Sequence, residues 1–150
     1  MSEQNKDLVR RLIEGFAGRN LDVIDQLLAP DFVDHDLPPD QRPDREDYKR
    51  DLSKDRDAFS NFGITIEDQI AEGDKVVTRL TWGGTHDKGE FMGMAPTDTT
   101  DEEVKVTAIF IHRIDGGEVK EEWSASDTLE RLRPSSAAPE PGWSGETGPG

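Results

Sequence analysis

Five side chains of this sequence could move a proton: Asp34 and His35, which are adjacent, and His86, His112 and Asp127 further along the chain. Imidazole and carboxylate groups are the usual general acids and bases of enzymes. Asp34 could act as a general base or hydrogen-bond acceptor at the floor of a pocket, or it could cap a turn. His35 could carry a proton or lie on the surface at the rim of a pocket.

The run Asp34-His35-Asp36 also raises the question of a metal site. Adjacent residues point in different directions, and no second pair of ligands has a diagnostic spacing. The histidines are isolated from one another in the sequence. We therefore predict no metal site.

The place of His112 depends on the register of the hairpin around Gly116-Gly117, because a slip of one residue exchanges the two faces of a strand. A two-residue loop pairs Phe110 with Trp123 and puts His112 and Phe110 on one face with Trp123 and Asp127. A three-residue loop pairs Phe110 with Ser124 instead, and the shared face then holds Glu122, Ser124 and Ser126. Apolar patterning favours the first register.

His86 and Asp127 each allow two interpretations. His86 could line the mouth of a pocket, or its imidazole could bond to the loop backbone. Asp127 could be catalytic, or it could make a structural hydrogen bond near the C-terminal turn.

The first third of the chain is predicted to be helical. Leu8, Val9, Leu12, Ile13 and Phe16 follow helical spacing between Ser2 and Gly18. A second, short helix is expected over residues 21–28, ended by Pro30, and a Pro-rich loop then runs to position 43. A third helix begins after Asp44, with an apolar stripe that includes Tyr48 and Phe59.

From Ile64 the apolar period changes to two, which predicts strands. Ile64, Ile66 and Ile70 alternate with polar residues, and the next strands are expected over 75–85, 104–114 and 118–127. Helices followed by an antiparallel meander give an α+β fold. Residues 1–133 are predicted to form one domain, and residues 134–150, which are rich in Pro, Gly and Ser, a flexible tail.

Composition narrows the function classes. The chain has 33 acidic against 18 basic residues, a net charge of -15, and no cysteine. Such a charge repels phosphate backbones and anionic lipids, so we predict neither nucleic-acid nor membrane binding. The sequence shows neither a long apolar run nor a secretory signal, so a soluble, cytoplasmic protein is expected. The acidic excess resembles that of salt-adapted proteins, although an acidic mesophilic protein would look similar.

Four segments, in order, resemble the SnoaL-like polyketide cyclase and ester cyclase family of the NTF2-like superfamily. They are "LAPDFVDHD", "AEGDKVVTRLTWGGTH", "GEFMGMAPT" and "IHRIDGGEVKEEWSASD", within about residues 3–133. The resemblance implies a cone formed by a curved antiparallel sheet against about three N-terminal helices. It also implies a ligand pocket, a homodimer, and ring closure by an intramolecular aldol step without a cofactor.

In the cyclases the aldol step uses an aspartate and a nearby histidine. By this resemblance the aspartate position falls at Ser124 and the histidine position at Phe110, which favours the hairpin register that pairs these two residues and leaves the register open. A serine without a base cannot shuttle a proton near neutral pH. Asp34 falls where the cyclases have a pocket asparagine. An aspartate in an apolar pocket can have a pKa near neutrality, so Asp34 is the first-choice base, assisted by His35, His86 or His112.

Three functions stay open at this point. The weakest is an epoxide-hydrolase-like site, which would need a buried Asp-Arg-Asp arrangement; Arg79 and Arg113 lie on expected strands, but their spacing does not indicate one. The first is cyclisation, isomerisation or hydration of a hydrophobic or polycyclic small molecule, and the second is a non-catalytic NTF2-like binding or association domain. Apolar side chains could line the ligand pocket in either case, because methionine adapts to irregular shapes and aromatic rings pack on flat ligands. With Ser124, the expected ligand-binding residues are Trp82, Phe91, Met92, Met94, Phe110 and Trp123.

Overall fold

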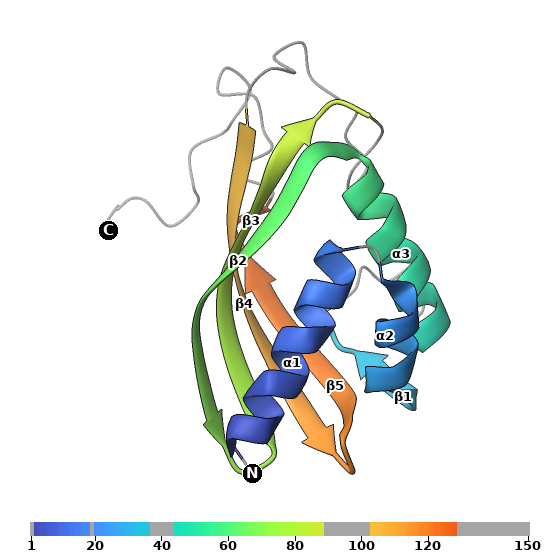
Figure 1. Cartoon of the computed structure of the whole chain (residues 1–150), viewed down its shortest axis with the longest axis vertical. Helices are drawn as coiled ribbons and strands as arrows, with labels where there is room; N and C mark the ends of the chain where they lie inside the picture. Colours follow the sequence, from blue (N-terminus) through green and yellow to red (C-terminus); the bar gives the residue numbers. More distant parts are fainter. Residues whose placement is uncertain (1, 19, 37–43, 89–102, 129–150) are drawn as a thin grey trace, which may run out of the picture.

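A computed structural model of the chain describes residues 2–18, 20–36, 44–88 and 103–128, in which three helices lie against one face of a curved five-stranded sheet (Figure 1). The elements in order are α1 (Ser2–Ala17), α2 (Leu21–Leu27), β1 (Leu28–Asp34), α3 (Arg45–Asp57), β2 (Phe59–Glu72), β3 (Lys75–His86), β4 (Glu103–Asp115) and β5 (Glu118–Ser126). Within these ranges, no helix combines the length and apolar character needed to cross a bilayer.

The core lies between the helices and the inner face of the sheet. The apolar stripe of α1 contributes Val9, Leu12 and Ile13, which are buried. Residues of α2, β1, α3, β3, β4 and β5 complete this cluster, namely Ile24, Leu27, Leu28, Phe32, Tyr48, Val76, Leu80, Ala108, Ile114 and Val119. Burial of this apolar surface is the main force that holds the helices on the sheet.

The sheet has the strand order β1-β5-β4-β3-β2. The four strands β2 to β5 form the predicted antiparallel meander, but β1 is an additional strand that pairs in parallel with β5. The sequence predicted a loop after Pro30. That prediction was wrong for residues 31–34, which belong to β1. Pro30 is tolerated because β1 lies at the edge of the sheet, where one side of the strand makes no ladder bonds.

Two further boundaries differ from the prediction. Helix α3 begins after Asp44, whose carboxylate accepts the amide of Asp47 at 3.0 Å, as expected for an N-cap. The helix ends at Asp57, however, and Phe59 begins β2. In β2 the register shifts between Ile66 and Asp68, so Ile70 is 62% exposed while Ile66 packs on the core. A bulge of this kind reverses the inward and outward alternation of the strand.

Candidate active site

Glu122 is the centre of a buried polar network that joins three elements. Its Oε1 atom accepts a hydrogen bond from the hydroxyl group of Tyr48 in α3 at 2.6 Å and lies 2.8 Å from Nε2 of His112 in β4. The exposed fractions are 3% for Glu122, 1% for His112 and 8% for Tyr48. Burial and the neighbouring Glu122 carboxylate raise the pKa of Tyr48 well above its usual value, so this phenol stays protonated.

Asp34 lies next to Glu122, because the last residue of β1 pairs with Glu122 in the parallel ladder between β1 and β5. Asp34 is only 7% exposed, and one of its carboxylate oxygens accepts the amide of Asp36 at 3.0 Å. Burial, together with the negative charge of Glu122, raises the pKa of Asp34 from 3.8 to about 7. Its carboxyl group therefore exchanges a proton near neutral pH.

The hairpin between β4 and β5 brings His112 opposite Glu122. Gly116 and Gly117 both have positive φ angles, 61° and 79°, which only glycine adopts without strain. The ladder pairs Phe110 with Ser124 and His112 with Glu122. The pairing that apolar patterning favoured is therefore wrong, and the pairing of Phe110 with Ser124 is confirmed. The three-residue loop expected with it is wrong, because Asp115 pairs with Glu118 across a two-residue turn and a register shift between Arg113 and Ile114 produces the observed pairing.

The resemblance to the cyclases implied a catalytic pair at Phe110 and Ser124. The ionisable pair, His112 and Glu122, is the next pair on the same face of the ladder, two residues along each strand. Phe110 and His112 have parallel rings with centroids 5.8 Å apart. Ser124 is half-buried, and its backbone amide donates a hydrogen bond to Asp36 Oδ2 at 2.7 Å. Phe110 and Ser124 are therefore immediate neighbours of the His112–Glu122 pair.

His35 and Trp123 lie together on the opposite, outer face of the sheet. Their rings stack with a centroid distance of 4.7 Å, and His35 Nε2 lies 2.8 Å from Glu121 Oε1. Glu121 also pairs with Arg113, and these hydrogen bonds hold the pKa of Glu121 below its usual value. The structure does not bring His35 and Trp123 to the buried network, because adjacent strand residues point to opposite faces.

His86 and Trp82 belong to a second cluster around Phe59. The His86 ring is 5.1 Å from the Phe59 ring, and the Trp82 ring is 5.4 Å from it. His86 is buried, opposite Phe59 in the ladder between β2 and β3. His86 is therefore inside the fold, where a residue that lines a pocket would lie, but it belongs to a different cluster from Asp34.

Asp127 lies just beyond the end of β5. Its Oδ1 atom accepts the backbone amide of Thr107 at 2.9 Å, and its own amide bonds to the Thr107 carbonyl. This is the structural bond that the sequence allowed as one alternative. Phe91, Met92 and Met94, the other expected ligand-binding residues, lie outside the described residues, as does the proposed tail at 134–150.

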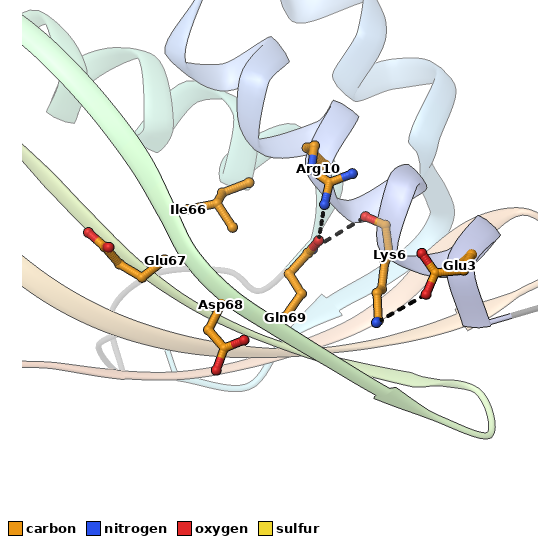
Figure 2. Close-up of a pocket in the computed structure, with 7 residues that line it drawn as sticks. All are labelled: Glu3, Lys6, Arg10, Ile66, Glu67, Asp68 and Gln69. Carbon is orange, nitrogen blue, oxygen red and sulfur yellow. Dashed lines mark hydrogen bonds and ion pairs between the residues drawn. The ribbon is translucent and has the colours of Figure 1, made fainter.

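Two shallow hollows of about 320 and 350 Å³ lie along α1, away from the buried network. Figure 2 shows the first, where Gln69 of β2 points toward α1 and bonds to Arg10 and to the backbone of Lys6. Its lining is mostly charged, unlike the apolar lining of typical small-molecule sites. In the part of the chain that the structure describes, no three histidine or carboxylate side chains are arranged to hold a metal ion.

Sequence reasoning did not select Glu122 or Tyr48 as site residues. Glu122 appeared only as a member of one hairpin face, and Tyr48 only as part of an apolar helix stripe. A signal for Tyr48 was available, since its ring packs like an apolar residue while its hydroxyl group needs a partner when buried. That partner could not be identified without the fold.

The chain is similar to known proteins in sequence and in fold. The family model for the SnoaL-like polyketide cyclases matches residues 6–134. Crystal structures give the same fold. IdmH of Streptomyces antibioticus, a candidate polyketide cyclase, has 31% identity and a TM-score of 0.72, covering 86% of this chain and 96% of that one. No curated protein matches the chain.

A second solved structure, a candidate SnoaL-like polyketide cyclase of Jannaschia sp. CCS1, has 25% identity and a TM-score of 0.75. The match covers 92% of this chain and 95% of that one. These likenesses confirm the predicted fold class, an NTF2-like cone of α+β type. The parallel pairing of β1 with β5 was not part of that prediction.

Proposed function

This chain belongs to the SnoaL-like polyketide cyclase family, and from that premise we propose that it binds a hydrophobic or polycyclic small molecule and converts it by acid/base chemistry. The reaction is a cyclisation, isomerisation or hydration carried by the protein's own side chains. The observation that supports this proposal is Asp34, a buried carboxyl group with a pKa of about 7 beside Glu122 and His112.

Asp34 has the properties that such a reaction needs. Near neutral pH a group with a pKa of about 7 is present in both protonated and ionised forms, so it can give a proton in one step and take it back in another. Its position on β1 also differs from the aspartate position of the cyclases, which is Ser124 here. We therefore propose that this chain performs the family's proton transfers from a neighbouring position.

The alternative is a non-catalytic binding domain of the same fold. A solvent-facing Asp34 and an interior filled with apolar side chains would favour that alternative. Asp34 is instead 7% exposed and lies among buried ionisable groups. Buried ionisable groups are costly to keep unless function requires them, so the enzyme is the better-supported candidate.

Deuterium exchange into 2-tetralone, a bicyclic ketone with acidic C–H bonds beside its carbonyl group, tests the proposal. Proton NMR in D₂O follows loss of the C1 signal with and without protein. We expect the wild-type protein to accelerate exchange, and Asp34→Asn to lower that acceleration by about 10²-fold, the usual effect of a general acid or base. Asp31→Asn is the matched control, since Asp31 lies on the same strand with its side chain 76% exposed.

The outcome that would contradict the proposal is an Asp34→Asn protein that is folded and exchanges 2-tetralone as fast as the wild type. A folded wild-type protein that gives no acceleration over buffer would contradict it as well. Circular dichroism of both variants establishes that they are folded.

A further inference from the structure

The two ring nitrogens of His112 have different surroundings. Nε2 lies 2.8 Å from Glu122 Oε1. Nδ1 is buried and has no hydrogen-bond partner among the described residues. An unpaired buried polar atom costs about 1–3 kcal/mol, so native proteins rarely retain one without a reason.

The contacts of Glu122 define which nitrogen carries the hydrogen. Oε1 of Glu122 accepts a hydrogen bond from the Tyr48 hydroxyl oxygen at 2.6 Å. An ionised carboxylate can only accept hydrogen bonds, so in its contact with His112 the hydrogen is on Nε2. Neutral histidine has one N–H group and one nitrogen lone pair. With the hydrogen on Nε2, the lone pair is on Nδ1.

Resting on the proposed function, we propose that His112 Nδ1 is the base that takes the proton from the substrate, while Glu122 and Tyr48 are positioning residues that hold its ring in this tautomer. A carboxylate behind an imidazole is a recurring arrangement of histidine bases, because it orients the ring and stabilises the imidazolium that forms. Tyr48 in turn orients the carboxylate.

The first step converts the ketone to its enol. A C–H bond beside the substrate carbonyl breaks, its hydrogen forms an N–H bond at Nδ1, and its electron pair becomes the C=C bond of an enol. The carbonyl oxygen takes the carboxylic hydrogen of Asp34, which becomes a carboxylate. His112 is then an imidazolium beside the negative charge of Glu122. Return of a proton to a different carbon gives an isomer, and attack of the enol carbon on a second carbonyl group closes a ring.

Two groups on one face of the sheet would then carry out the two proton transfers. Asp34 is the acid and His112 the base. Phe110 stacks on the His112 ring from the position where the cyclases have their histidine. The reacting carbon would therefore lie one ladder step from its expected place, nearer to α3 and Tyr48.

Nitrogen-15 NMR of the wild-type protein tests the tautomer without any substrate. We expect a protonated Nε2 with a slowly exchanging, downfield ring hydrogen, and an unprotonated Nδ1. In Glu122→Gln that ring hydrogen should exchange faster and move upfield. The matched control Glu121→Gln, a change on the outer face of the same strand, should leave it unaltered. A hydrogen on Nδ1 in the wild type would overturn the inference.

The exchange reaction with 2-tetralone tests the catalytic role. His112→Gln should lower the acceleration by about 10²-fold, with His35→Gln on the outer face as the matched control. Tyr48→Phe retains the packing of the ring and should lower kcat with little change in KM, which a purely structural effect on binding would not produce.

The outcomes separate the two proposals. If Asp34→Asn loses the acceleration while a folded His112→Gln protein retains it, the proposed function stands and the role of His112 is wrong. If the wild-type protein gives no acceleration, the proposed function fails, while the NMR spectrum still reports whether Glu122 holds His112 as described.

Discussion

At the scale of single residues, burial separates two neighbouring glutamates that differ only in the face of β5 they occupy. Glu121 lies on the outer face, where Arg113 and His35 hold its pKa below the usual value. Glu122 lies on the inner face, where its charge helps raise the pKa of Asp34 to about 7. In a chain with 33 acidic residues, this placement rather than the number of carboxylates decides which one exchanges a proton near neutral pH.

The raised pKa of Asp34 makes stability depend on pH. Between the unfolded value of 3.8 and the folded value of about 7, the native state binds more protons at this position than the unfolded state does. The contribution of Asp34 to the free energy of unfolding is therefore most favourable below about pH 4 and falls as pH rises to about 7. The charged groups that act on Asp34 from neighbouring elements are Glu122, Asp36 and His112.

Asp34→Asn should remove this dependence. We expect the variant to gain about 2–4 kcal/mol relative to the wild type between pH 4 and pH 8, since one pKa unit corresponds to about 1.4 kcal/mol. Urea unfolding of both proteins at several pH values measures the difference. A constant difference across this range would show that Asp34 titrates normally in the folded protein.

At the scale of elements, local signals predicted most of what is present. The helical stripe of α1 and the strands β3 and β4, expected over 75–85 and 104–114, depend on residues close together in the sequence, and they were predicted correctly to within one residue. Strand β1 was missed because its partner β5 lies about ninety residues later, so no local pattern identifies it. The hairpin register could not be predicted because it depends on a register shift between Arg113 and Ile114, beyond the two-residue turn, and that register decides whether His112 meets Glu122.

The paired glycines of β3 give a prediction at this scale. A Cβ atom on Gly84 would lie 2.8 Å from the Ser60 carbonyl oxygen and 3.1 Å from Cβ of Phe59, so Gly84→Ala forces β2 and β3 apart. We expect a loss of about 1–3 kcal/mol in the free energy of unfolding, typical of overpacking. Gly63→Ala is the matched control, because nothing lies within 4 Å of its added atom.

Thermal and urea unfolding of the two alanine variants provide the comparison. Equal stabilities would mean that β2 and β3 do not approach each other as closely as the structure places them. Since Phe59 and His86 flank this contact, the result also reports on the second aromatic cluster.

At the scale of the whole molecule, the family and the cone could be predicted from sequence, whereas the candidate active site could not. The site joins β1, α3, β4 and β5, and each element contributes one residue whose role depends on the other three. The homodimer stays a prediction. Ile70 and Ile109, 62% and 44% exposed on the sheet, are apolar side chains that such an interface could cover. The ligand-binding roles of Phe91, Met92 and Met94 also stay predictions.

We propose that this fold holds Asp34 as an acid/base group that exchanges a proton near neutral pH. Carbon-13 NMR titration of the Asp34 side-chain carboxyl group, assigned by comparison with Asp34→Asn, tests it most directly. We expect a midpoint near pH 7, because Asp34 is buried beside Glu122. A midpoint near pH 4, the value of a solvated aspartate, would show that Asp34 is not such a group.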